Sequence, residues 1–427
     1  MIKNIVLQHK AEKEKLLSKN YILREKLTPA KKVLDTDLIK VITGPRRAGK
    51  SVFAMLLLKN KDFAYLNFDD EELLKIKNYD EIIKAVFEIY PESQYILFDE
   101  IQNLENWEFF ANKLQRRGYN LILTGSNANL LNKELATVLT GRYIPIEIFP
   151  FSFKEFLDSK NLDIKKEYFE LPETKGKILS YLDEYLKSGG FPEVVVKNFT
   201  PESYLETLFD AILLKDVVKR YGVRFSQKIY DLSTYLINNV SFEFSFNRLK
   251  KILDFRSVNT IQNYLKYLEE SYLVFSLNRF SFKTKEQIKS PKKIYLIDNG
   301  FILAKSFQFS QNTGKLMENL VFIEILRRGY QLNKTFFYYK TRNKKEVDFI
   351  LKEGLEIKKL IQVCYEINNP EVEKRELGAL VEASEELKCD DLSIINWNYE
   401  EIKEFKGKKI KFIPLWKWLL QSTLSSS

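Results

Sequence analysis

The feature that most restricts the fold of this chain is the stretch GPRRAGKS at residues 44–51. It follows the apolar run LIKVIT (38–43) and precedes VFAMLLL (52–58), which predicts a buried strand, a glycine-rich turn and a helix. Glycines allow backbone N–H groups to close around phosphate oxygens, and the start of a helix adds positive potential. In this context the G-x-x-x-x-G-K-S spacing predicts a nucleotide-binding site rather than a chance turn.

The motif also predicts a role for each of its polar residues. Lys50 is expected to reach the β- and γ-phosphates of ATP, and Ser51 is expected to ligate Mg²⁺. The residues predicted to contact the nucleotide are Gly44, Pro45, Arg46, Arg47, Ala48, Gly49, Lys50, Ser51 and Val52.

A second motif, YILFDEIQN (95–103), ends an apolar run in two acids, Asp99 and Glu100. A strand that ends here would present both carboxylates at its carboxyl end. Asp99 would then complete the Mg²⁺ shell, and Glu100 would polarise the attacking water, with Lys50 as a further catalytic residue. An ordinary solvated pair of acids is the alternative.

Two later motifs supply further candidates for the nucleotide site. The run NLILTG (120–125) is followed by Ser126 and Asn127, either of which would sense the γ-phosphate; a plain Gly-Ser turn is the alternative. Arg142, in LTGRY (139–143), would point away from its own nucleotide and toward the site of a neighbouring subunit. There it would act as a catalytic arginine finger, unless it is simply a surface arginine.

Apolar strand-like runs alternate with helical patterns over the first 150 residues, which predicts a parallel α/β sheet. The later segments have other patterns, first helical and then α/β again. We therefore predict five parts: an N-terminal helix and linker (1–35), an ATPase core (36–150), a helical lid (151–235), a winged helix (236–305) and a C-terminal α/β domain (306–427).

Several motifs occur in an order that resembles a family of archaeal and bacterial AAA+-type ATPases: GPRRAGKS, LFDEIQN, LTGSN, LTGRY, PFSFKEF and GGFPEVV. The resemblance covers residues 35 to about 220. The last motif is similar to the G-x-P element of STAND-class signalling ATPases, which lies near the nucleotide and couples the lid to its state. The resemblance implies a P-loop core of the ASCE class, ATP hydrolysis and a homo-oligomer.

Residues 243–274 have the pattern of a helix, a turn and a second helix, followed by a basic segment that resembles the wing of a winged helix. The second helix would bury Val258, Ile261, Leu265 and Leu268. The residues predicted to contact DNA are Asn259, Thr260, Asn263, Lys266, Lys283, Lys285 and Lys289. The same basic segment also contains Arg279, Lys292 and Lys293. A lid or a protein-binding module is the alternative for this element.

The segments LMENLVFIEILRRGY (316–330), KEVDFIL (345–351) and LIQVCYE (360–366) resemble a C-terminal domain related to the PD-(D/E)xK nuclease fold. The resemblance assigns Glu318 and Asp348 to two metal-binding positions. Gln362 stands where the third acid is required, and the lysine of the E-x-K motif is missing. A literal E-x-K at residues 356–358 lies at a predicted hairpin start. We therefore expect a degenerate nuclease-like site with weak or absent cleavage.

Composition limits the partners and the compartment. The formal net charge of +10 is compatible with a polyanion such as DNA, either double-stranded or branched. Two cysteines cannot build a multi-disulfide framework, and the single histidine argues against histidine-rich metal sites. No apolar run reaches the roughly 18 residues of a membrane span, so we expect a cytoplasmic protein without membrane contact.

Together these observations favour a Mg²⁺-dependent ATP-hydrolysing switch or motor that acts on or with DNA. Two alternatives stay open at this point. One is a STAND-like signalling ATPase whose winged helix and C-terminal domain bind protein partners. The other is a DNA nuclease gated by ATP.

Overall fold

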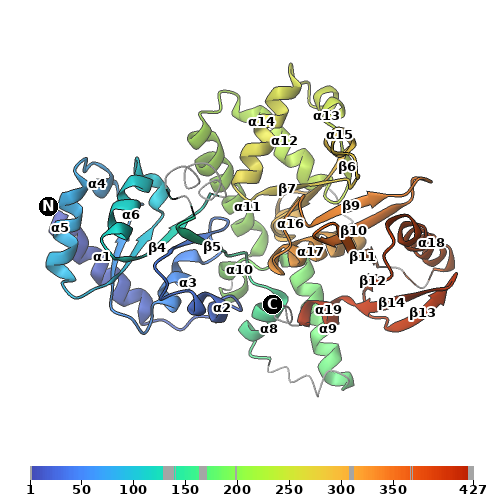
Figure 1. Cartoon of the computed structure of the whole chain (residues 1–427), viewed down its shortest axis with the longest axis horizontal. Coiled ribbons are helices and arrows are strands. Elements are labelled where there is room, and N and C mark those ends of the chain that lie inside the picture. The colour runs from blue at the N-terminus through green and yellow to red at the C-terminus, as the bar shows by residue number, and fades with distance from the viewer. Residues whose placement is uncertain are drawn as a thin grey trace. The chain divides into compact units, whose positions relative to one another are not determined.

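The structure is a computed structural model in which residues 2–127, 139, 141–162, 171–197, 200–306, 312–365, 367 and 369–421 are described (Figure 1). These residues form two compact units. The first consists of Met1–Phe151 with Glu270–Tyr272, and the second consists of Ser152–Glu269 with Leu273–Ser427. Across the described ranges, no helix has both the length and the apolar character that crossing a membrane requires.

The first unit contains the predicted parallel sheet, with five strands in the order β2-β3-β4-β1-β5. All neighbouring strands are parallel. The strands are β1 (Ile39–Thr43), β2 (Phe63–Asn67), β3 (Tyr95–Asp99), β4 (Asn120–Gly125) and β5 (Tyr143–Glu147). Because β1, β4 and β3 run parallel, the glycine-rich turn after β1 and the acids after β3 lie at the same edge of the sheet.

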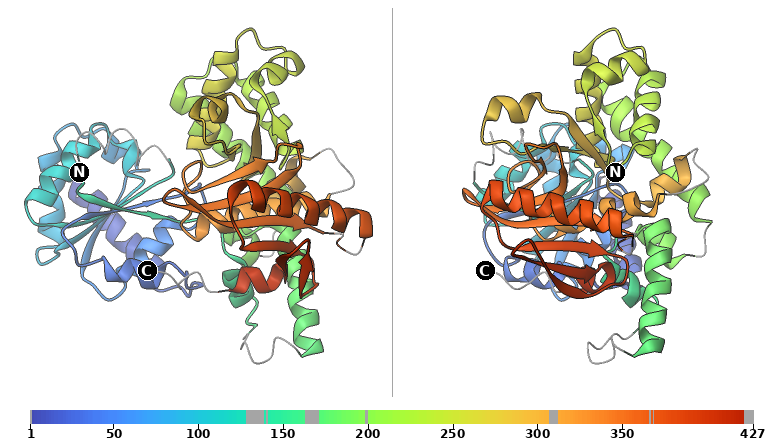
Figure 2. Two further views of the ribbon diagram at one scale, coloured as in Figure 1. Left: turned by 45° about the vertical axis from the view of Figure 1, so that its right-hand side comes forward. Right: turned by 90° about the vertical axis from the view of Figure 1, so that its right-hand side faces the viewer.

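Helices cover both faces of this sheet, as Figure 2 shows for the blue and cyan part of the chain. Successive β1 side chains enter opposite cores, because side chains of a strand alternate between faces: Val41 packs in one core and Ile42 in the other. The helices of this unit are α1 (Ile2–Leu17), α2 (Leu27–Lys32), α3 (Lys50–Leu57), α4 (Glu71–Leu74), α5 (Tyr79–Ile89) and α6 (Trp107–Arg116).

The N-terminal residues 1–35 were expected to be a helix and a linker, but they are packed into the first unit. Val6 of α1 is fully buried. The ammonium of Lys13 is also buried and donates a hydrogen bond to the carbonyl of Phe63 on β2, at 2.9 Å. Hydrophobic and polar contacts therefore tie this segment to the sheet.

The second unit begins with a helical stretch, as the sequence pattern predicted, and its role as a lid stays a prediction. The helices are α8 (Phe153–Ser159), α9 (Pro172–Ser188), α10 (Pro192–Val196), α11 (Pro201–Ala211), a π-helical continuation (Ile212–Lys219) and α12 (Ser226–Asn238). The predicted helix–turn–helix follows as α13 (Phe246–Ile252) and α14 (Val258–Glu270).

A small antiparallel sheet of order β6-β8-β7 follows these helices. Its strands are β6 (Glu243–Phe244), β7 (Val274–Asn278) and β8 (Lys292–Leu296). The basic segment between β7 and β8 is not a simple hairpin loop, because it contains the short helix α15 (Thr284–Lys289). The helix α16 (Gly300–Lys305) comes next along the chain.

The C-terminal part contains a mixed six-stranded sheet of order β13-β14-β12-β11-β10-β9. Its strands are β9 (Phe336–Lys340), β10 (Glu346–Glu353), β11 (Glu356–Cys364), β12 (Leu392–Asn396), β13 (Glu401–Phe405) and β14 (Lys408–Pro414), and its helices are α17 (Thr313–Arg327), α18 (Pro370–Leu387) and α19 (Leu415–Leu420). Helix α18 begins where Asn369 caps it and Pro370 occupies its first turn.

The double glycine of GGFPEVV ends helix α9 and is held by a buried carboxylate. Asp298 accepts one hydrogen bond from the N–H of Gly190 and another from the N–H of Gly300, each at 2.8 Å. Burial raises the pKa of Asp298 to about 6, although both hydrogen bonds oppose the shift. Gly189 has φ +76° and ψ −166°, a conformation that is essentially restricted to glycine.

Replacing Gly189 with alanine should destabilise the second unit by about 3 kcal/mol or more, since backbone strain and a steric clash act together. A Cβ atom at this position would lie 1.6 Å from Oδ1 of Asp298. Gly176→Ala is the matched control: that residue lies inside α9 with open space around it, so alanine should stabilise the protein by ~0.5–1 kcal/mol. The free energies of unfolding in urea check both values. If the two variants had equal effects, the backbone of Gly189 would not require glycine.

Candidate functional site

At the carboxyl ends of β1, β3 and β4, three polar residues lie next to Asp99: Ser51, Thr124 and Glu100. Oδ1 of Asp99 accepts a hydrogen bond from the Ser51 hydroxyl at 2.8 Å and another from the Thr124 hydroxyl. Burial and the neighbouring Glu100 raise the pKa of Asp99 to about 6. The hydroxyl of Ser51 and the carboxylate of Asp99 are oxygen ligands of the type that Mg²⁺ prefers, so the residues present fit this metal.

Two backbone features of the glycine-rich turn require glycine. A Cβ atom on Gly44 would lie 1.9 Å from the carbonyl oxygen of Ile148, so the backbone approach excludes any side chain there. Gly49 has φ +90° at the start of α3, a left-handed conformation that glycine adopts without strain. The predicted turn before a helix therefore forms at these residues.

The remaining predicted residues of the turn differ in exposure. Pro45 and Ala48 are buried, Arg46 and Val52 are half-buried, and Arg47 is exposed with a φ of +66°. Lys50 is only 4% exposed. Its ammonium donates to the carbonyl of Pro45 at 3.0 Å and lies 3.8 Å from Oε1 of Glu100.

Glu100 has an unusual backbone for a residue with a side chain. Its φ of 51° and ψ of 44° place it in the left-handed region, which costs about 1 kcal/mol or more for a non-glycine residue. Its N–H donates to Oγ1 of Thr124 at 3.0 Å, and the side-chain amide of Gln102 donates to its carboxylate. Neighbouring strands thus hold this strained residue beside Lys50.

The two candidate γ-phosphate sensors follow strand β4. Ser126 is 1% exposed, and its hydroxyl has no hydrogen-bond partner among the described residues. A buried hydroxyl without a partner is energetically costly, which suits a group that meets a ligand oxygen. Asn127 is half-buried at the end of a described range and offers no comparable signal.

Arg142 lies at the opposite end of the sheet from the glycine-rich turn. Its carbonyl accepts a hydrogen bond from the N–H of Ile39, which begins β1, at 2.9 Å. The five residues of β1 span about 16 Å, so the backbone of Arg142 lies about the length of this strand away from the glycine-rich turn. Its side chain is exposed and donates to Oδ1 of Asn112 at 3.4 Å. Its action on a neighbouring subunit stays a prediction.

Sequence reasoning missed Arg24, which supports the glycine-rich turn from outside. The residue is 8% exposed. Its guanidinium donates to the carbonyl of Ala48 at 2.9 Å and to the carbonyl of Phe149, and it lies 5.0 Å from the ring centroid of Phe151. No local pattern marks this arginine, because its partners are up to 125 residues away.

The predicted DNA-contact residues lie on α14 and around α15. On α14, Ile261, Leu265 and Leu268 are buried as expected, whereas Val258 is only half-buried. Thr260 is also half-buried, and the other six candidates are exposed: Asn259, Asn263, Lys266, Lys283, Lys285 and Lys289. The assignment of Lys293 to the exposed basic segment was wrong, because this residue is fully buried and paired with carboxylates.

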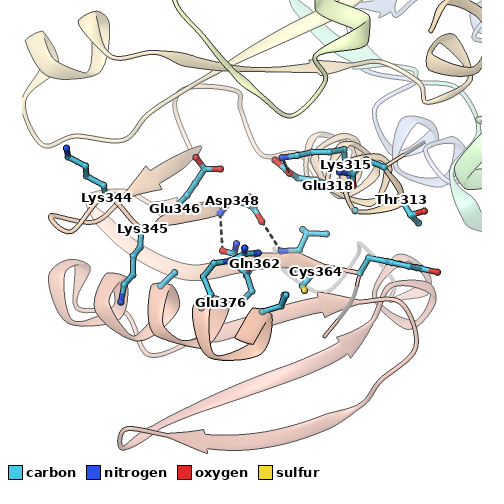
Figure 3. A pocket seen from close by; sticks show the side chains of 17 residues that line it. Thr313, Lys315, Glu318, Lys344, Lys345, Glu346, Asp348, Gln362, Cys364 and Glu376 are labelled. Atoms are coloured by element: carbon cyan, nitrogen blue, oxygen red, sulfur yellow. Dashed lines mark hydrogen bonds and ion pairs between the residues drawn. The ribbon is translucent and has the colours of Figure 1, made fainter. Parts of the chain in front are cut away.

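In the C-terminal part, the structure brings the residues of the nuclease-like pattern together. Glu318 of α17 and Asp348 of β10 both contact the ammonium of Lys293, and Gln362 of β11 accepts a hydrogen bond from the N–H of Asp348 at 3.3 Å. They border a pocket of about 1060 Å³ (Figure 3). The literal E-x-K at residues 356–358 forms the solvated start of β11, as predicted, and its two charged side chains pair with each other.

The Arg24→Ala variant should loosen the glycine-rich turn without removing a predicted nucleotide contact. Two carbonyls would lose a charged donor in a buried setting, so stability should fall by about 1–3 kcal/mol and affinity for an ATP analogue should fall with it. Thermal unfolding and equilibrium binding are the measurements. Arg24→Lys is the control, since one ammonium keeps the charge and should recover part of the loss. If folded Arg24→Ala protein bound the ATP analogue with wild-type affinity, Arg24 would not be needed to support the glycine-rich turn.

Comparison with known proteins identifies the first unit and the family of the whole chain. The AAA domain family matches residues 36–157, and two families described as domains of unknown function (DUF8612 and DUF4143) match residues 179–312 and 313–418. An uncharacterised protein of Methanocaldococcus jannaschii is 40% identical over 430 residues, which is 96% of this chain and 92% of that protein. An uncharacterised protein of Haemophilus influenzae is 35% identical over 405 residues, covering 91% and 95%.

Two solved structures have a lower similarity. The Walker-type ATPase of Pyrococcus abyssi is 15% identical, with 68% of this chain and 99% of that chain covered and a TM-score of 0.40. Cdc6p of Pyrobaculum aerophilum is 13% identical, with 62% and 91% covered and a TM-score of 0.27. On the two full-length relatives and the AAA match, the chain belongs to the same family as the M. jannaschii and H. influenzae proteins and carries an AAA-type P-loop ATPase domain.

Proposed function

We propose that this chain binds ATP with Mg²⁺ at the carboxyl edge of its parallel sheet and hydrolyses the γ-phosphate. One observation carries this proposal: Lys50, Ser51, Asp99 and Glu100, predicted from two separate motifs, converge at that edge with Ser51 and Asp99 in direct contact. Hydrolysis requires a cation facing the phosphates, oxygen ligands for the metal and a carboxylate near the attacking water. The convergence supplies all three.

Each residue has a distinct role in this proposal. The N–H groups of residues 44–51 and the ammonium of Lys50 bind the phosphate oxygens. Bound Mg²⁺ offsets phosphate charge, and Ser51 and Asp99 would hold it. Glu100 accepts a proton from the attacking water, and the Ser126 hydroxyl donates to the γ-phosphate, which gives this buried group the partner it otherwise lacks.

Glu100→Gln and Lys50→Ala should separate catalysis from binding. The amide of glutamine cannot take a proton as the carboxylate does, so Glu100→Gln should keep its ATP affinity and slow hydrolysis by about 100-fold or more. Lys50→Ala removes a charged donor from the phosphates and should weaken ATP binding by roughly 10- to 100-fold. Nucleotide titration and phosphate-release assays measure these effects. If Glu100→Gln protein hydrolysed ATP at the wild-type rate, Glu100 would not be the group that accepts the proton from water.

A second proposal concerns the partner of the ATPase. We propose that the helix–turn–helix region contacts DNA, because α14 exposes Asn259, Asn263 and Lys266 while its apolar face is buried, and the lysines at 283, 285 and 289 are exposed nearby in sequence. Such groups suit phosphate and base-edge contacts. A STAND-like switch that binds protein through this region is the competing function. We also propose that the chain forms a homo-oligomer, in which the exposed Arg142 would contact the nucleotide site of a neighbouring subunit.

Replacing Lys283, Lys285 and Lys289 with alanine tests the DNA proposal. Each neutralised phosphate contributes about −0.9 to the slope of log K against log[salt], so the loss of three contacts should make the slope shallower by roughly 2.7. The matched control replaces Lys406, Lys409 and Lys411, three exposed lysines of the β13–β14 hairpin, and should leave the slope unchanged. Salt titrations of duplex DNA binding measure both. An absence of DNA binding by the wild-type protein would favour the protein-binding switch.

A further inference from the structure

The most unusual group in the second unit is the ammonium of Lys293 on strand β8. The side chain is 1% exposed. Its Nζ lies 2.6 Å from Oε1 of Glu318, 2.7 Å from Oε1 of Glu346 and 3.1 Å from Oδ1 of Asp348. The ammonium donates hydrogen bonds to Glu318 and Asp348 and forms a close ion pair with Glu346, so three carboxylates from two different elements surround it.

The remaining oxygens of these carboxylates also have partners. Oε1 of Glu318 accepts a hydrogen bond from the Tyr295 hydroxyl at 2.8 Å, and its Oε2 accepts one from Lys315 at 3.1 Å. Oδ2 of Asp348 accepts the N–H of Val363 at 3.0 Å, and this bond is drawn in Figure 3. A buried carboxylate is tolerated only when its oxygens are satisfied in this way.

Two of the three carboxylates also lie near a second lysine. Oε2 of Glu318 lies 3.1 Å from Lys315, and Oε2 of Glu346 lies 3.6 Å from Lys340, which is itself paired with Glu243 at 2.7 Å. Burial opposes the charge on Lys293, but the carboxylates, Glu318 foremost, raise its pKa well above the usual range.

A divalent metal does not fit this arrangement. It would need the space of the Lys293 ammonium, at oxygen distances of about 2.0–2.6 Å rather than the longer ones seen here. Among the residues that the structure describes, no group of three or more His, Cys, Asp and Glu side chains is arranged to hold a metal. Nor does Lys293 stand in the position of the missing lysine of the nuclease pattern, because it lies on β8 and not on β11, the strand of Gln362.

We propose that the Lys293 ammonium takes the place of a divalent cation between Glu318, Glu346 and Asp348, so that the C-terminal site holds a built-in cation and takes up no metal. The cation comes from β8, within the region of residues 179–312, while its ligands lie in the region of residues 313–418. The site is thus completed by a strand that precedes the domain to which its acids belong. This inference concerns the C-terminal part alone and is independent of the ATPase proposal.

The experiment replaces Lys293 with methionine in the full-length protein and follows unfolding by tryptophan fluorescence without nucleotide. Three of the four tryptophans, at 397, 416 and 418, belong to the second unit. Removing one partner of a buried ion pair leaves unpaired charge, so the Tm of Lys293→Met should fall by about 10 °C. Millimolar Mn²⁺ should recover a large part of this loss, because a divalent cation can satisfy the carboxylates that the ammonium has left.

Two controls make this response specific. The Tm of wild-type protein should not rise comparably with Mn²⁺. Any effect of Mn²⁺ at the P-loop site is the same in both proteins and cancels in the comparison. Lys293→Met combined with Asp348→Asn removes one positive and one negative charge together, keeps the net charge of the wild-type cluster and should also be insensitive to Mn²⁺. A folded Lys293→Met protein that gains no more from Mn²⁺ than wild type overturns the proposal, since the position would then not suit a divalent cation.

A second measurement does not depend on the folding of Lys293→Met. Direct titration of Mn²⁺ by electron paramagnetic resonance compares wild-type protein with Asp348→Asn, which keeps two of the three ligands of Lys293. Equal numbers of bound Mn²⁺ are expected, because Asp348 binds no metal in the wild-type protein. The loss of one bound ion in Asp348→Asn would show that metal enters the site beside Lys293 and would overturn the proposal.

Discussion

The first unit depends on the alignment of parallel strands, which brings residues that are far apart in sequence to a single edge. Asp99 ends β3, Ser51 lies in the first turn of the helix after β1, and Thr124 lies on β4 between them. Their hydrogen bonds cross three strands and position the acid next to the glycine-rich turn. The parallel alignment of these strands is therefore the physical basis of the site.

The two acidic clusters of the chain differ in how their charge is satisfied. The donors to Asp99 are the neutral hydroxyls of Ser51, Thr124 and Tyr65, which stabilise the carboxylate without cancelling its charge. In the C-terminal cluster the central donor is the ammonium of Lys293, which cancels charge directly. The hydrogen-bond donors to Asp99 are thus neutral, whereas the C-terminal carboxylates contact a cation directly.

Local patterns predicted much of the fold and the local structure of the two motifs that carry the candidate nucleotide site. The five parallel strands and the turn at residues 44–51 could be predicted because each depends on neighbouring residues: apolar runs, glycines and the Lys-Ser pair. The start of α18 also follows a local pattern, since Asn369 and Pro370 form a recognisable helix start.

Long-range contacts explain the parts that sequence reasoning missed. Arg24 occurs in a charged stretch and resembles a surface residue until the fold places it against Ala48 and Phe149. Lys293 was assigned to a basic surface segment because its neighbours in sequence are basic, whereas its partners lie 25 to 55 residues further on. Charge alone does not reveal whether a lysine faces solvent or fills a buried site.

The packing of α1 and Arg24 has a consequence for dividing the protein into pieces. A fragment that begins at residue 36, where the AAA match begins, retains every residue of the two nucleotide motifs but lacks the segment that covers part of the sheet. It would expose apolar surface that Val6 covers and leave the Ala48 and Phe149 carbonyls without their arginine. The boundary of the sequence family is therefore not the boundary of the cooperative folding unit, which extends to the first helix.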